Sequence, residues 1–153
     1  MDLAGALVEL GRDRFDRLLA GISIGSLKRF QVFDNFKIRA RVSKLNREKL
    51  RKAGPGFWSR IEAGESELAK EIAQAVLVSR LDFVAAALNF LEIPHDGNGF
   101  FDKDDATREK LGEGWQKRLF DRFKGEFPEE LVLLYINHLD WELNKPETVF
   151  TAA

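Results

Sequence analysis

The stretch that most constrains this chain is residues 68–93, LAKEIAQAVLVSRLDFVAAALNFLEI, in which apolar residues occupy nearly every position. A helix that is apolar around almost its whole circumference must be buried, so the other elements have to surround it. Arg80 and Asp82 interrupt the stretch, and neither apolar half reaches the roughly 18–20 residues of a membrane span. The sequence therefore predicts a buried central element and no membrane-spanning helix.

We predict two helices in this stretch, over residues 66–78 and 80–92, that meet at a bend; one long helix is the alternative. Ser79-x-x-Asp82 resembles a capping box, and Pro94 should end the second helix. Amphipathic patterns predict further helices over residues 2–19, 47–53, 104–124 and 129–143, with a short one that begins at Pro55; a sharp kink at residues 54–56 is the alternative there. The expected fold is an all-α, single-domain bundle of about five to seven helices around the central pair.

Residues 28–42 have an ambiguous pattern. Phe36, Ile38, Ala40 and Val42 alternate with basic residues, which is the period of a strand and favours a short hairpin near residues 29–42. Ile38 and Val42 also have helical spacing, and an isolated hairpin among helices is only marginally stable. We therefore expect irregular or partly helical structure here, with the hairpin as the alternative.

The composition limits the chemistry that the chain can perform. Its 153 residues are the length of one domain, and it contains no cysteine. A disulfide framework, a thiolate nucleophile and a cysteine-ligated zinc ion are therefore excluded. Residues 1–19 lack a basic leader and carry acids among their apolar residues, unlike a signal peptide. We expect a cytoplasmic protein without a cofactor.

Charge is distributed unevenly along the chain. Residues 28–61 contain 11 basic and 2 acidic residues, whereas residues 62–153 contain 10 basic and 19 acidic ones. Basic residues interleaved with phenylalanines can follow a phosphate backbone and stack on bases, but no nucleic-acid-binding motif is present. A solvated basic face, or one that balances the acidic half, is the favoured interpretation. The candidate residues for binding a polyanion or an acidic partner are Arg39, Arg41, Lys44, Arg47, Arg51 and Lys52.

The aromatic content suggests a surface for a partner. Thirteen Phe and three Trp residues exceed what a core of modest helices needs, and exposed apolar patches are typical of interaction sites. Phe100 and Phe101 follow a clear turn over residues 95–99 and are the candidate exposed contacts; alternatively, they cover one end of the bundle.

We favour a non-catalytic protein-interaction module that binds another protein or forms a homodimer with complementary basic and acidic halves.

Catalytic and metal-binding motifs find little support. Residues 21–25 match G-x-S-x-G, but a predicted helix and not a strand precedes them. His138 and Glu142 lie four residues apart on one helical face, and two ligands do not make a metal site. We therefore expect no metal. The remaining alternative is a small-ligand-binding protein or an enzyme with a pocket near Arg80, Asp82 and His138.

Overall fold

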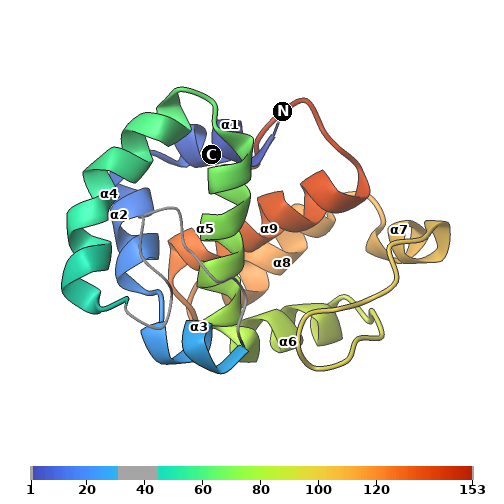
Figure 1. Cartoon of the computed structure of the whole chain (residues 1–153). Coiled ribbons are helices and arrows are strands. Elements are labelled where there is room, and N and C mark those ends of the chain that lie inside the picture. Colours follow the sequence, from blue (N-terminus) through green and yellow to red (C-terminus); the bar gives the residue numbers. More distant parts are fainter. Residues whose placement is uncertain (1, 31–44, 153) are drawn as a thin grey trace.

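The computed structural model describes residues 2–30 and 45–152, with only the backbone described at residues 29 and 30. These residues form nine α-helices and no strand (Figure 1), which confirms the all-α prediction. The helices are α1 (Leu3–Leu10), α2 (Arg12–Ala20), α3 (Ile24–Phe30), α4 (Arg47–Glu62), α5 (Ser66–Val78), α6 (Leu81–Phe90), α7 (Asp105–Leu111), α8 (Trp115–Phe123) and α9 (Glu129–Leu143). No helix in this part of the chain combines the length and the apolarity that crossing a membrane requires.

Helix α5 occupies the middle of the molecule (Figure 1) and contacts α1, α2, α3, α4, α6 and α9. Its inward side chains include Leu68, Ile72, Ala73 and Val76, all of which are buried. Full burial of one large aliphatic side chain stabilises a fold by about 1.5–3 kcal/mol. Burial of this helix is therefore the central packing interaction of the fold.

The predicted bend between α5 and α6 is present, but its cause differs from the prediction. Ser79 Oγ donates to the carbonyl oxygen of Ala75 at 2.7 Å and accepts from the backbone N–H of Ser23 at 2.7 Å. The residue that precedes α6 is Arg80, and no side chain caps this helix end. The capping-box prediction is wrong because the Ser79 hydroxyl bonds back into α5 and across to the segment before α3.

Glycines divide two of the predicted helices, which raises the number of helices in the described residues above the expected five to seven. Gly11 separates α1 from α2 with a φ of 97°, a left-handed conformation that favours glycine. Gly112 and Gly114 separate α7 from α8 in the same way, with φ values of 70° and 75°. The predicted helices over residues 2–19 and 104–124 are therefore each two helices.

Helix α4 continues through Pro55, so the prediction of two helices meeting there is wrong. Leu50 and Phe57 lie on one buried stripe that spans the proline. Gly54 lies on the same stripe, where an added Cβ would be 3.4 Å from Leu19 Cδ1 of α2. A proline inside a helix costs about 3 kcal/mol or more. Close packing of this stripe on α2 compensates for that cost.

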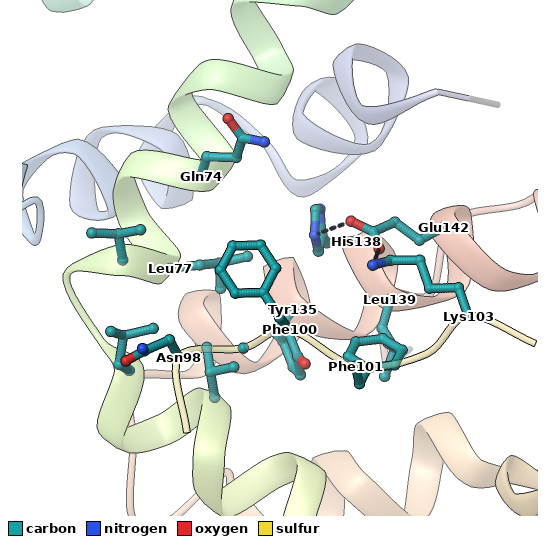
Figure 2. Close-up of a pocket in the computed structure, with 14 residues that line it drawn as sticks. Gln74, Leu77, Asn98, Phe100, Phe101, Lys103, Tyr135, His138, Leu139 and Glu142 are labelled. Carbon is teal, nitrogen blue, oxygen red and sulfur yellow. Dashed lines mark ion pairs between the residues drawn. The ribbon is translucent and has the colours of Figure 1, made fainter. Parts of the chain in front are cut away.

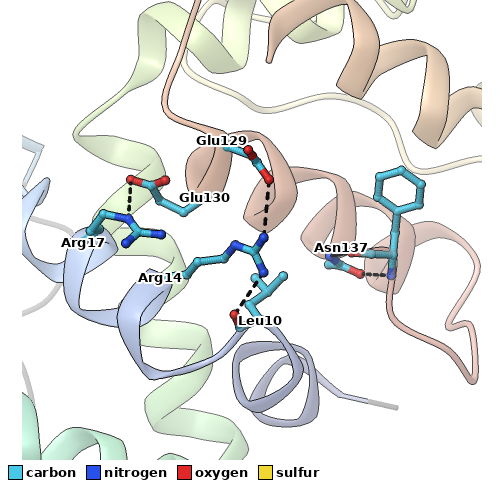
Figure 3. A network of polar contacts seen from close by, with 7 residues as sticks. Leu10, Arg14, Arg17, Glu129, Glu130 and Asn137 are labelled. Carbon is cyan, nitrogen blue, oxygen red and sulfur yellow. Dashed lines mark hydrogen bonds and ion pairs between the residues drawn. The ribbon is translucent and has the colours of Figure 1, made fainter. Parts of the chain in front are cut away.

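Two arginines of α2 meet the acidic first turn of α9 (Figure 3). Arg14 Nη2 lies 3.4 Å from Glu129 Oε1, and Arg17 Nε lies 3.5 Å from Glu130 Oε1. The helix dipole also favours acids at this end of α9. Partly exposed pairs contribute at most about 1 kcal/mol each, so they orient α2 on α9 more than they stabilise the fold.

Asn137 on α9 holds the C-terminal segment against the core. Its Oδ1 accepts from the backbone N–H of Phe150 at 2.9 Å, and its Nδ2 donates to the carbonyl oxygens of Phe150 at 2.9 Å and Leu133 at 2.8 Å. The Phe150 ring packs edge-on against Phe120. The buried amide therefore bonds to both main-chain groups of one residue of the tail.

Helix α3 includes residues 29 and 30, so the first two residues of the alternative hairpin near residues 29–42 are helical. Residues 31–44 lie outside the described residues, and the rest of that hairpin stays a prediction.

We expect Asn137→Ala to lower the free energy of unfolding by about 1–3 kcal/mol, because the main-chain groups of Phe150 lose their partner. Urea unfolding followed by circular dichroism measures this loss. Lys117→Ala serves as the control, since it removes only an exposed ion pair with Asp121 and should change stability by less than about 0.5 kcal/mol. Equal stability of the two variants would contradict the role of Asn137.

Candidate functional site

A pocket of about 420 Å³ lies where α5, α6 and α9 meet the loop between α6 and α7, residues 91–104. Leu77 and Val78 of α5, Val84 of α6 and Leu139 of α9 supply apolar walls. Helix α5 is the buried central helix, so the pocket opens on a part of the fold that is fixed by packing. A concave site with apolar walls and a few polar groups is typical of small-molecule sites.

One carboxylate joins two nitrogen groups on the polar wall of the pocket. Figure 2 shows Glu142 between His138 and Lys103; its Oε1 lies 2.7 Å from His138 Nε2, and its Oε2 lies 3.3 Å from Lys103 Nζ. His138 and Glu142 are one turn apart on α9, whereas Lys103 comes from the loop. The side chain of His138 is 13% exposed and that of Glu142 is 22% exposed, so water screens the contact between them only partly.

The pKa of the Glu142 carboxyl lies below its ordinary value of 4.5. Burial acts to raise this pKa, because it disfavours the charged form. The hydrogen bond and charge of His138, together with those of Lys103, act in the opposite direction and outweigh burial. Glu142 is therefore ionised at neutral pH and balances the charge of Lys103.

Tyr135 and His138 present two buried polar atoms without partners. Their rings are stacked one turn apart on α9, with centroids 6.3 Å apart and planes inclined by 27°. Tyr135 is 3% exposed, and neither its hydroxyl nor His138 Nδ1 has a hydrogen-bond partner within residues 2–30 and 45–152. Burial, and then the charge of Glu142, raise the pKa of the Tyr135 hydroxyl, which stays protonated at neutral pH. An unpaired buried polar atom costs about 1–3 kcal/mol, which sets this wall apart from an ordinary core face.

The loop over residues 91–104 is held by its own hydrogen bonds, and the predicted turn at residues 95–99 is present. Asp96 Oδ1 accepts from the backbone N–H of Phe100 at 3.1 Å, and the backbone N–H of Asp96 donates to the Phe100 carbonyl at 3.1 Å. His95 Nδ1 accepts from the N–H of Gly97 at 3.1 Å, which leaves Nε2 to donate to Asn89 Oδ1 at 2.7 Å. These bonds place Phe100 at the pocket.

The two predicted exposed aromatic contacts differ in their environment. Phe100 is 71% exposed, whereas Phe101 packs against the core with Lys103 Nζ 4.7 Å from its ring centroid. Both line the pocket, and Figure 2 shows the Phe100 ring between Gln74 and the loop. Phe100 therefore remains a candidate contact for a partner, whereas Phe101 belongs to the pocket wall.

Arg80 and Asp82 do not line this pocket. Arg80 Nε lies 3.1 Å from Asp82 Oδ1, and the guanidinium carbon is 5.3 Å from the Phe127 ring centroid. The hydrogen bond from Arg80 holds the pKa of Asp82 below its ordinary value. Of the three residues predicted to form a pocket, the structure therefore places only His138 in it.

The predicted polyanion-binding residues are not free where the structure describes them. Arg47 donates to the main-chain carbonyls of Ala20, the last residue of α2, at 3.0 Å and of Ile22 at 2.6 Å. Arg51 and Lys52 both pair with Glu48, at 2.7 Å and 3.7 Å. Arg39, Arg41 and Lys44 lie outside the described residues. The three described candidates are thus engaged within their own helix or with the end of α2 and the turn after it.

Tyr135 and Lys103 were not predicted as site residues. Tyr135, His138 and Glu142 occupy positions i, i+3 and i+7 of one helix face, so the spacing contained a signal for Tyr135. Lys103 comes from another part of the chain, and no local pattern indicates it. Across the two described segments, no group of three or more histidines and acids is arranged to hold a metal ion.

Comparison with known proteins found no match among family models, curated proteins or solved structures. The pocket and its polar wall are therefore the features from which a function can be inferred.

Glu142→Gln is expected to lower the free energy of unfolding at neutral pH by about 1 kcal/mol, because the amide loses its charged contacts with His138 and Lys103. Since the folded-state pKa lies below 4.5, this stability is present above that pH and is lost as the pH falls through the folded-state value. Urea unfolding of both proteins from neutral pH to about pH 3 should show the difference shrinking in acid. A difference that does not change with pH would contradict the charge argument.

Proposed function

We propose that this protein binds a small, largely apolar molecule in the pocket between α5, α6, α9 and the loop over residues 91–104. The observation that supports this proposal is the convergence of apolar walls with Tyr135, His138, Lys103 and Glu142 around about 420 Å³. A core face that only stabilises the fold has no need of buried polar atoms without partners. Binding of a small molecule requires no sequence motif, and this agrees with the lack of catalytic motifs in the sequence.

The size of the pocket favours a small molecule. Ligand pockets are typically about 300–1,000 Å³, with apolar linings and a few polar groups that fix orientation. A chemical step would require a nucleophile or a general base in contact with substrate. His138 is the nearest candidate, but its unpartnered nitrogen, Nδ1, is buried and does not face the open pocket. Binding is therefore the function that the geometry supports best.

Val78→Phe is expected to weaken binding of the neutral dye N-phenyl-1-naphthylamine at least tenfold, because the larger side chain fills part of the pocket. The fluorescence of this dye rises in apolar surroundings, so a titration measures its dissociation constant directly.

Val8→Phe is the matched control for this measurement. Val8 lies on α1, is 41% exposed and does not line the pocket, so the same substitution there should leave dye binding unchanged. Equal weakening in both variants, or no dye binding by the wild-type protein, would contradict the proposal.

A second candidate function, protein interaction, is supported by the exposure of Phe100. A large aromatic side chain that is 71% exposed on a well-ordered turn is suited to insertion into a partner. The partner would be another protein or a second copy of this chain, with the basic segment of one copy facing the acidic segment of the other.

For the homodimer, Phe100→Ser should raise the dissociation constant at least tenfold, because burial of an aromatic side chain contributes about 1.5–3 kcal/mol. Sedimentation equilibrium measures this constant. A wild-type protein that remains monomeric at high concentration would exclude the homodimer.

A further inference from the structure

One ion pair, between Lys103 and Glu142, lies on the polar wall of the pocket. The only other ionisable groups that line the pocket in the described residues are His138 and Tyr135. Because Lys103 and Glu142 are engaged with each other, a charged ligand would lose its hydration without a partner from this pair, which is costly in a site of low polarity.

The polar atoms of the wall define which uncharged group fits. His138 Nε2 lies 2.7 Å from Glu142 Oε1, so Nδ1 is the ring nitrogen without a partner within the described residues. The Tyr135 hydroxyl can donate, since it has no partner within the described residues. Both groups lie on the same face of α9. A hydroxyl both donates and accepts, so a ligand hydroxyl can bond to the Tyr135 hydroxyl whichever of the two donates.

We infer that the ligand is an uncharged apolar molecule with a hydroxyl group, an alcohol or a phenol, whose oxygen bonds to the Tyr135 hydroxyl. This inference rests on the proposed function, because it names the chemical class of the molecule in the same pocket. Both polar atoms are covered by neighbouring side chains, so binding includes a small movement of the pocket walls. The exposed Phe100 ring is the wall element with the fewest packing constraints.

Four probes that share one naphthalene ring test this inference by isothermal titration calorimetry at pH 7. They are 2-naphthol, 2-methylnaphthalene, 2-naphthoate and 2-naphthylmethylammonium, which differ in one substituent and its charge. The expected result is that 2-naphthol binds about tenfold more tightly than 2-methylnaphthalene, as one or two added hydrogen bonds allow. Both charged probes should bind at least tenfold more weakly than 2-naphthol.

Tyr135→Phe assigns the preference to the proposed atoms. The variant should bind 2-methylnaphthalene as the wild type does and should lose most of the preference for 2-naphthol. It removes a buried hydroxyl without a partner, so it should fold with at least the wild-type stability, and thermal unfolding checks this.

The possible failures can be told apart. If N-phenyl-1-naphthylamine and all four probes fail to bind, the proposed function is wrong, and the inference is wrong with it. If the dye binds but 2-naphthoate or the ammonium probe binds as tightly as 2-naphthol or more tightly, the pocket accepts a charged ligand. The inference alone is then overturned. Equal binding of 2-naphthol and 2-methylnaphthalene would overturn the hydroxyl assignment.

Discussion

Burial of α5 is the interaction on which the rest of the structure depends. Six of the described helices pack on it, and its apolar side chains from Leu68 to Leu77 are buried on several faces at once. No single neighbour could cover such a helix, because each packed helix covers only one stripe of its surface. The short helices at the N-terminus, the long α4 and the C-terminal α9 therefore have to converge on it from different directions (Figure 1).

The pocket follows from the way this central packing ends. Helix α5 stops at Val78, and α6 leaves in a new direction after the Ser79 hydroxyl has bonded to two neighbouring segments. The angle between the two helices leaves a concave region that α9 and the loop over residues 91–104 complete. The polar side chains of α9 at this point face the pocket instead of the solvent, and Lys103 supplies the opposite charge to Glu142.

Several charges of the basic segment and of the acidic half are paired with near neighbours in the part of the chain that the structure describes. Arg51 pairs with Glu48 three residues away, and Arg47 bonds to backbone carbonyls. The two contacts between α2 and the start of α9 are longer in range, yet they also join helices that pack directly (Figure 3). The described ion pairs form within the chain and therefore do not require a partner protein of opposite charge.

The sequence by itself determined the helical class, the break near residue 79 and the bounds of α9, because periodicity and proline effects act over a few residues. Only the tertiary structure decided that α4 continues through Pro55, since packing on Leu19 of α2 outweighs a local penalty. It also decided that His138 meets Lys103 through Glu142 and that Arg80 and Asp82 pair elsewhere. Such pairings join residues that no local pattern relates, because they depend on how helices distant in the chain are placed against α5.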